Sequence, residues 1–352
     1  MRAMDHTVAT RLQPTDNSYT APMQHVRLGN SGLKVSRLCL GTMTFGLQVD
    51  EQNSIAIMDK ATEGGITFFD VADGYPLGGD LTTVGRTEEI VGRWLTGRRS
   101  DYILATKCFM PMGRNAWDMG NSRRHIMDSV DASLRRLNTD FIDLYQLHFD
   151  DPSVPLDETM QALDDLVRAG KVRYVGCSNF LAYRLATALG RSDVQHLVRF
   201  VSIQPRYNLV FREFERELFP LCAQEGIGVI PYNPIAGGLL SGKYDRTKSP
   251  DEGTRFTLGT AGKIYQDRYW NDNVFNTVDT LAKLANQAGV ALPTLAVAWT
   301  LRNPVITSPI IGASKVEQLD ATLAAVDYEI DDDLYEQLNA VTTPYRRGDA
   351  PR

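Results

Sequence analysis

The segment RLCLGTMTFGLQVDEQNSIAIMDKATEGGITFFDV, residues 37–71, contains the pattern on which the fold prediction depends. Its two ends, 37–41 and 67–71, are short and rich in apolar or β-branched residues, as buried strands are. Between them, residues 52–63 have helical periodicity and are followed by a Gly-Gly pair, which commonly ends a helix. A strand, a helix and a second strand in this order predict a βαβ unit with parallel strands.

The same alternation continues along the chain. Further strands are predicted at 102–106, 141–147, 174–177, 201–203, 228–231 and 308–311. Amphipathic helices are predicted between them, for example at 123–137 and 156–169. The length of 352 residues is compatible with one or two domains. Because no Pro-, Gly- or charge-rich linker interrupts the eight units, we favour the α/β class and a single (β/α)8 TIM barrel over two doubly wound sheets.

Three additions to the barrel are predicted from the sequence. They are an N-terminal β-hairpin at 25–36, a long loop excursion after strand 7 at 245–272, and an extra C-terminal helix at 331–342. The turn residues Asn30, Ser31 and Gly32 favour the hairpin. The expected boundaries are a flexible N-terminal tail at 1–24, the barrel at 25–345 and a C-terminal tail at 346–352.

Composition excludes several classes of partner. Lys and Arg number 37 against 43 Asp and Glu, a net charge of −6, so no basic excess favours nucleic acid or an anionic membrane. No apolar stretch approaches the roughly 18 residues that cross a bilayer, and residues 1–24 lack the apolar centre of a secretion signal. The cysteines are dispersed and the five His lack ligand spacing, so we expect a reducing cytoplasm, no disulfide framework and no metal. The cysteines, which we expect to be small buried hydrophobes, are Cys39, Cys108, Cys177 and Cys222.

Four ionisable residues follow neighbouring predicted strands: Asp70, Tyr75, Lys107 and His148. Each alone is compatible with a structural role, as a helix cap, a loop aromatic, a solvated amine or a satisfied core histidine. In a parallel barrel, however, the loops after the strands form one mouth, where active sites lie. Together these groups therefore predict acid–base chemistry at that mouth.

Seven motifs from the same positions carry a family resemblance. They are FFDVADGY (68–75), LATK (104–107), DLYQLH (143–148), GCSNF (176–180), IQPRYN (203–208), YNPIAGGLLSGKY (232–244) and IIGASKVEQL (310–319). In order and approximate spacing they resemble the aldo-keto reductases, from about residue 26 to residue 326. The resemblance is strongest with the branch that includes bacterial reductases and potassium-channel β subunits.

This resemblance implies reversible, NADPH-dependent reduction of aldehydes or ketones to alcohols, with Tyr75 as proton donor. A phenol has a pKa of about 10 and donates reluctantly near neutral pH. A cation such as Lys107 favours the phenolate, and a carboxylate such as Asp70 keeps that cation charged and fixed. His148 could donate a hydrogen bond to the substrate carbonyl and orient it. The main alternative is a cofactor-binding regulatory or redox-sensor protein, whose relatives commonly lack this His.

The cofactor prediction also depends on the resemblance. The usual dinucleotide fingerprint fails, since Gly226 and Gly228 are followed by Pro231 where it needs Gly. Relatives instead bind NADPH or NADP+ across the barrel mouth. The resemblance assigns the nicotinamide carboxamide to Ser178, Asn179 and Gln204, the ring to Tyr232, the pyrophosphate to Leu239, Ser241 and Lys243, and the adenine side to Gln318. Ser314 and Lys315, expected at a helix start after strand 8, would bind the 2′-phosphate. Asn233 departs from the motif, where Ser is common.

Substrate identity stays open at this level. Phe109, Trp117 and Phe149 are expected to form an apolar rim for a carbonyl substrate or its alcohol. Tyr265, Tyr269 and Trp270 either close over the site or pack against the barrel. Aromatic or aliphatic carbonyls and ketosugars all remain possible substrates, and no interface signal fixes an oligomeric state. A second rival mechanism would use Lys107 as a Schiff-base amine.

Overall fold

The computed structural model describes residues 23–346, so the predicted tails lie outside this range except for positions 23, 24 and 346. Eight parallel strands form one sheet in the order β10-β3-β4-β5-β6-β7-β8-β9. The strands are β3 (Cys39–Gly41), β4 (Phe68–Asp70), β5 (Ile103–Cys108), β6 (Ile142–Leu147), β7 (Val172–Ser178), β8 (Phe200–Gln204), β9 (Gly228–Val229) and β10 (Ile310–Ile311). The two edges meet, because Thr307 N donates to Val229 O and Ile310 N to Pro231 O, both at 2.8 Å. The predicted barrel is confirmed.

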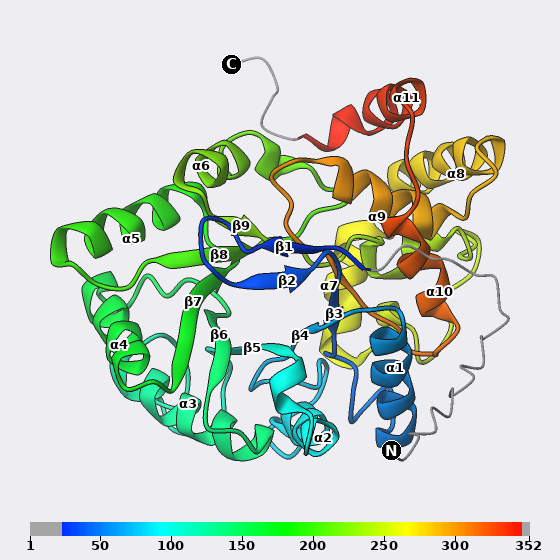
Figure 1. Cartoon of the computed structure of the whole chain (residues 1–352). Helices are drawn as coiled ribbons and strands as arrows, with labels where there is room; N and C mark the ends of the chain where they lie inside the picture. Colours follow the sequence, from blue (N-terminus) through cyan, green and yellow to red (C-terminus); the bar gives the residue numbers. More distant parts are fainter. Residues whose placement is uncertain (1–22, 347–352) are drawn as a thin grey trace, which may run out of the picture.

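Helices surround this sheet (Figure 1). The barrel helices are α1 (Glu51–Glu63), α2 (Arg86–Leu95), α3 (Arg123–Leu137), α4 (Leu156–Arg168), α5 (Ala182–Gln195), α6 (Leu218–Glu225), α9 (Leu292–Arg302) and α10 (Gln318–Leu323). Local sequence fixes several helix starts. Asp50 and Ser122, for example, accept hydrogen bonds from the backbone N–H groups three residues on, which cap α1 and α3.

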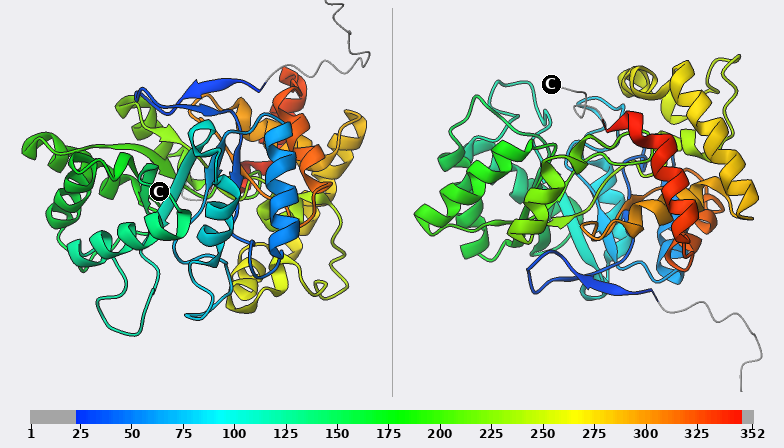
Figure 2. Two further views of the ribbon diagram at one scale, coloured as in Figure 1. Left: turned by 60° about the horizontal axis from the view of Figure 1, so that its bottom comes forward. Right: turned by 90° about the horizontal axis from the view of Figure 1, so that it is seen from above.

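The predicted hairpin closes one end of the barrel. Strands β1 (His25–Arg27) and β2 (Lys34–Ser36) pair antiparallel. Leu28 and Val35 are fully buried and pack on an apolar layer inside the barrel. This layer consists of Cys39, Phe68, Ala105, Leu144, Ile230 and Ile310. Since these residues lie toward the amino-terminal ends of the strands, the opposite end is the one available to ligands. Both views in Figure 2 show the hairpin (dark blue) and α7 (yellow) at opposite ends of the barrel.

The excursion after β9 differs from the prediction. Residues 245–272 are not only a loop, because they contain the 3-10 turn η4 (Arg255–Thr257) and the helix α7 (Gly259–Tyr269), before α8 (Asp272–Gln287) begins. Apolar burial explains these elements, since Phe256, Tyr265 and Tyr269 are at most 5% exposed. The helix lacks a strong apolar stripe and contains two glycines, which hid it in the sequence.

Three further predictions can be compared with the structure. The C-terminal helix is α11 (Asp332–Thr342), and Asp331 caps it by accepting from Leu334 N. All four cysteines are buried free thiols, as expected. Among residues 23–346, no helix combines the length and apolar character needed to cross a membrane.

Candidate active site

Four inward-facing side chains form a polar layer above the apolar layer of the barrel. Asp70 ends β4, Lys107 lies one residue before the end of β5, Gln146 lies in β6 and Gln204 ends β8. The pairing of β5 with β6 sets Lys107 opposite Gln146. All four are buried, with at most 2% of each residue exposed. With the nearby Tyr75, we call these residues the floor.

Lys107 is the centre of the floor. Its Nζ donates to Asp70 Oδ2 at 2.6 Å, to Val71 O at 2.8 Å and to the Tyr75 hydroxyl at 3.1 Å. All three ammonium protons therefore have acceptors. Burial opposes its charge, but Asp70 and Tyr75 outweigh burial and raise the pKa of Lys107 above its ordinary value. The lysine is held as a cation at the position that the sequence predicted.

Asp70 is fixed on both oxygens. While Oδ2 accepts from Lys107, Oδ1 accepts from Gln146 Nε2 at 3.1 Å and from Gln204 Nε2 at 2.8 Å. Gln146 was not selected from the sequence, although it stands two residues before His148 in a strand and so faces the same side. Gln204, predicted to bind a carboxamide, directs its amide N–H toward Asp70.

Tyr75 lies in the loop after β4 and is only 8% exposed. Burial raises the pKa of Tyr75, and although Lys107 opposes this, the net direction is upward. Lys107 thus acts in the expected direction and lowers the pKa of Tyr75, but burial, which was not considered at the sequence level, outweighs it. At neutral pH the phenol keeps its proton, as a proton donor must.

His148 completes the predicted tetrad. Its ring lies edge-on to Tyr75, with 5.7 Å between ring centroids and an interplanar angle of 81°. Burial and the charge of Lys107 hold the pKa of His148 well below its usual range. Its Nδ1 is buried without a hydrogen-bond partner among residues 23–346. A neutral imidazole with one unused nitrogen is thus available beside the phenol.

The predicted apolar rim is assembled only in part. Phe149 stacks on His148 with 5.0 Å between centroids, and Phe109 lies 5.4 Å from Phe149. These two aromatic residues border the tetrad. Trp117 is 49% exposed and has the Arg124 guanidinium 4.9 Å from its ring centroid. Its contacts are thus with α3, and it makes no ring contact with the other two.

The residues expected at the nicotinamide are close together. Asn179 Nδ2 donates to His148 O at 2.9 Å and to Ser178 Oγ at 3.0 Å, and the Tyr232 hydroxyl donates to Asn179 Oδ1 at 2.8 Å. Ser178 Oγ donates to Gln204 O at 2.8 Å. Burial raises the pKa of Tyr232 to about 12, so this phenol remains a neutral aromatic surface.

The segment after β9 forms the turn η3 (Ala236–Ser241), in which Gly237 and Gly238 have positive φ angles of 68° and 99°. Leu239 is buried and packs in the core, so its side chain is not available to a ligand. Ser241 Oγ donates to Gly238 O at 2.7 Å, and Lys243 is exposed. The turn thus presents glycine backbone, a hydroxyl and a cation in one short stretch.

The expected phosphate site after β10 needs a correction. Ser314 and Lys315 do not begin a helix, since α10 starts at Gln318. Instead, Gln318 Oε1 accepts from Ser314 N at 2.9 Å and from Ser314 Oγ at 3.3 Å. The side chain of Gln318 closes the turn before the helix, and Lys315 is left exposed.

The excursion lies against the site as well as the core. Tyr265 forms hydrogen bonds with the Asn233 side chain at 3.1 and 3.2 Å and acts electrostatically on Tyr75. Tyr269 accepts from Asn208 Nδ2 at 3.2 Å. Trp270 instead packs among Tyr244, Phe256 and Phe275. The packing alternative thus holds for all three residues, and Tyr265 in addition contacts Asn233, next to Tyr232.

Two ionisable residues near the site were missed. Arg255, in η4, packs its Cγ beside Gly237 and has a buried Nη1 without a partner in the described part of the chain. Asp73 is 0% exposed, and neither carboxyl oxygen has a partner within residues 23–346. Burial and the neighbouring Glu88 raise the pKa of Asp73 well above its ordinary value. Asp73 lies in the FFDVADGY motif without having been selected from it, and no motif contains Arg255, whose surroundings come from distant segments.

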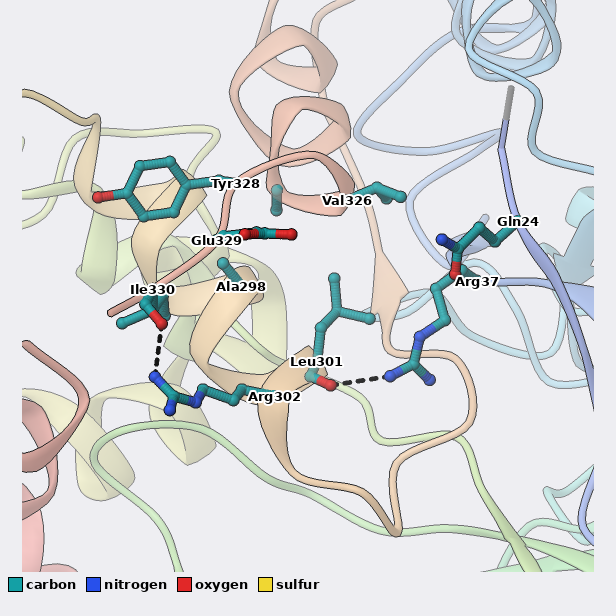
Figure 3. A pocket seen from close by; sticks show the side chains of 10 residues that line it. Gln24, Arg37, Ala298, Leu301, Arg302, Val326, Tyr328, Glu329 and Ile330 are labelled. Carbon is teal, nitrogen blue, oxygen red and sulfur yellow. Dashed lines mark hydrogen bonds between the residues drawn. The ribbon is translucent and has the colours of Figure 1, made fainter. Parts of the chain in front are cut away.

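A cavity of about 400 Å³ lies away from this site (Figure 3). Its lining includes Gln24, just before β1, Arg37, just before β3, and Leu301 and Arg302 at the end of α9. Arg37 donates to the carbonyls of Leu301 and Thr307 at 2.8 and 2.6 Å, which caps the end of α9. We therefore assign Arg37 a structural role.

Comparisons with known proteins place the chain in one family. The model of the aldo/keto reductase family matches residues 37–343. The uncharacterized oxidoreductase YrpG of Bacillus subtilis is 39% identical over 328 residues, covering 91% of this chain and 96% of that protein. A probable voltage-gated potassium channel subunit beta of Arabidopsis thaliana is 38% identical over 310 residues, covering 87% and 92%. A putative aryl-alcohol dehydrogenase of Schizosaccharomyces pombe is 34% identical over 360 residues, covering 93% and 97%.

Proposed function

Because the chain belongs to the aldo/keto reductase family, whose match covers residues 37–343, we propose that it is an NADPH-dependent carbonyl reductase. It would reduce an aldehyde or ketone to the alcohol, reversibly, with Tyr75 as proton donor. The observation that carries this proposal is the buried contact of Lys107 with both Asp70 and the Tyr75 hydroxyl. The buried free cysteines fit a reducing cytoplasm, which we propose as the compartment.

The residues at the mouth fit a phosphate-bearing dinucleotide. A buried guanidinium N–H without a partner, on Arg255, requires an acceptor, and it lies beside the glycine turn of η3. Ser178, Asn179, Gln204 and Tyr232 would hold the carboxamide and ring. Ser241, Lys243, Arg255 and the backbone of Leu239 would hold the pyrophosphate. Ser314 and Lys315 would bind the 2′-phosphate, with Gln318 on the adenine side.

The chemistry of the site follows from its protonation states. A bound nicotinamide would supply or accept a hydride. The Tyr75 hydroxyl, which keeps its proton at neutral pH, lies 3.1 Å from the Lys107 cation, and that cation would stabilise the phenolate left after proton transfer. His148, neutral beside the phenol, would donate to the substrate carbonyl oxygen and orient it. A Schiff-base role for Lys107 is disfavoured, because a nucleophilic amine must be uncharged.

The proposal is tested by NADPH oxidation with a panel of aldehydes, ketones and sugars. The wild type is compared with Tyr75→Phe and with Tyr183→Phe, a control at a tyrosine that is 64% exposed. We expect Tyr75→Phe to bind NADPH but to lose about 10²–10⁴-fold in carbonyl reduction, whereas the control keeps wild-type rates. NADPH binding without turnover by the wild type would favour the regulatory alternative, for which the Arabidopsis relative's name is a precedent. A wild type that does not bind NADPH would contradict the proposal.

A further inference from the structure

Two arginines lie beside Tyr232 on the wall formed by the loop after β8 and by α7. The backbones of Arg206 and Tyr232 form an isolated parallel β-bridge. The Arg206 guanidinium lies 3.5 Å from the ring centroid of Phe211 and 5.9 Å from that of Tyr269. The guanidinium of Arg268 lies 5.9 Å from the ring centroid of Tyr265. Burial raises the pKa of Tyr232, and both guanidiniums oppose that shift. We call Arg206 and Arg268 the cationic wall.

The cationic wall has no counter-ion. Within residues 23–346, neither guanidinium forms an ion pair or a hydrogen bond. Other arginines do, as Arg184 of α5 pairs with Asp150 and Arg246 with Asp279. Arg206 lies near the ring of Tyr269 and Arg268 near that of Tyr265, and these two rings have centroids 6.3 Å apart. Because Arg206 is half-buried, its charge is only partly solvated, and a bound anion would offset it.

The position of the wall points to the substrate as the source of that anion. The proposed cofactor phosphates already have Lys243, Arg255 and Lys315, which lie after β9 and β10. Arg206 instead follows β8, beyond Gln204 of the floor. Tyr265, beside Arg268, forms hydrogen bonds with the side chain of Asn233, which follows Tyr232 in the chain. The wall therefore lies beside the proposed nicotinamide site, where the carbonyl compound would be transformed.

We propose that Arg206 and Arg268 form an anion subsite for the substrate, so that the preferred carbonyl compound carries a carboxylate or a phosphate ester. This inference rests on the proposed function. Arg206 provides the stronger contact because its half-buried charge is screened less than the exposed charge of Arg268. The stacking of Arg206 on Phe211 holds the planar guanidinium in place, which suits recognition of a planar carboxylate.

The test compares substrates of one shape and different charge. With saturating NADPH, kcat/KM is measured for 4-carboxybenzaldehyde and 4-methylbenzaldehyde, and for glyceraldehyde 3-phosphate and glyceraldehyde. We expect the wild type to prefer the charged member of at least one pair about 10-fold or more, mainly through KM. Arg206→Gln should abolish that preference and Arg268→Gln should weaken it, whereas Arg246→Gln, in the ion-paired control, should leave it unchanged. The pair that responds distinguishes carboxylate from phosphate.

Binding measurements separate this inference from the proposed function. The dissociation constants of NADPH and of 4-methylbenzoate are measured by calorimetry on the same variants. Equal preference for charged and neutral aldehydes in the wild type would overturn the subsite. So would a wall variant that weakens NADPH binding and leaves the substrate preference intact, since the arginines would then serve the cofactor. If no aldehyde is reduced, the proposed function fails, and the subsite stands only if 4-methylbenzoate binding depends on Arg206.

Discussion

The floor of the mouth differs from a second set of residues around it in how polar and charged groups are satisfied. This second set, Arg206, Arg255 and Arg268, is called the rim below. On the floor, Lys107 donates to three acceptors and both oxygens of Asp70 accept hydrogen bonds. On the rim, Arg206, Arg255 and Arg268 have no acidic partner in the described part of the chain. The floor is organised before any ligand arrives, whereas the rim is completed by one. The acid–base groups are therefore positioned by the protein alone, whereas the charges of the three arginines are left for a ligand to neutralise.

The most severe change to the floor is Lys107→Met. It leaves Asp70 buried without its cation, which we expect to lower the free energy of unfolding by about 3–5 kcal/mol and carbonyl reduction by about 10²-fold or more. Urea unfolding measures the first and NADPH oxidation the second. The control is Lys171→Met, since Lys171 forms a half-exposed pair with Asp131 and should cost less than about 1 kcal/mol. Equal losses in both variants would show that the floor has no special rigidity.

Asp73 is an exception to the comparison, because it is unsatisfied although it lies two residues before Tyr75. Its pKa is raised in the folded state, so its contribution to stability is complete below about pH 4 and is lost as the pH rises through the folded pKa. Asp73→Asn cannot ionise, so its stability relative to wild type should rise with pH by up to about 1.4 kcal/mol per unit. Urea unfolding at pH 5 to 8 checks this. A constant difference across that range would mean that Asp73 is already ionised.

On the rim, Arg255→Gln should act on the ligand and hardly on the fold. We expect NADPH binding to weaken about 10–100-fold, because a charge-assisted contact is worth about 1.5–3 kcal/mol. The ligand-free protein should unfold at nearly the same urea concentration, since Arg255 forms no ion pair within residues 23–346 and its guanidinium lies 5.5 Å from the ring centroid of Tyr265. Fluorescence titration gives the affinity, and Arg246→Gln is the matched control. If Arg255→Gln markedly lowered the stability of the ligand-free protein, Arg255 would be a structural residue like those of the floor and not one that awaits a ligand.

His148 joins the two regions, since its ring contacts Tyr75 while Nδ1 is unpartnered. Its pKa is lowered in the folded state, so the unfolded chain binds the proton more readily below about pH 6.5. Its stabilisation is thus present above that pH and declines as the pH falls, by about 1 kcal/mol between pH 7 and pH 5.5. His148→Gln should lose this decline, whereas a change at the exposed His196 should keep it. An identical pH dependence in wild type and His148→Gln would contradict the assignment.

The difference between the floor and the rim also explains which site residues could be predicted from the sequence. Asp70, Lys107 and His148 stand at or near the ends of regular strands, and a parallel barrel brings such positions to one mouth. Gln146 could also have been found, because it lies in β6 two residues before His148, which directly follows the strand. Arg206 and Arg255 could not, since their neighbours depend on how the loop after β8 and residues 245–272 fold back. The actual start of α10 was missed for a similar reason, because a hydrogen bond between Ser314 and Gln318 closes a turn there.

The hairpin across the closed end has a consequence for how the proton is replenished. Under the proposed chemistry, Tyr75 must regain a proton after every turnover. Below the floor, the layer of residues from Cys39 to Ile310 is apolar and Leu28 and Val35 of the hairpin cover it, so within residues 23–346 this layer offers no polar side chain to relay a proton in that direction. The new proton must enter through the mouth, which the product occupies until it departs. Release of the product and reprotonation of Tyr75 would therefore follow one another through the same opening.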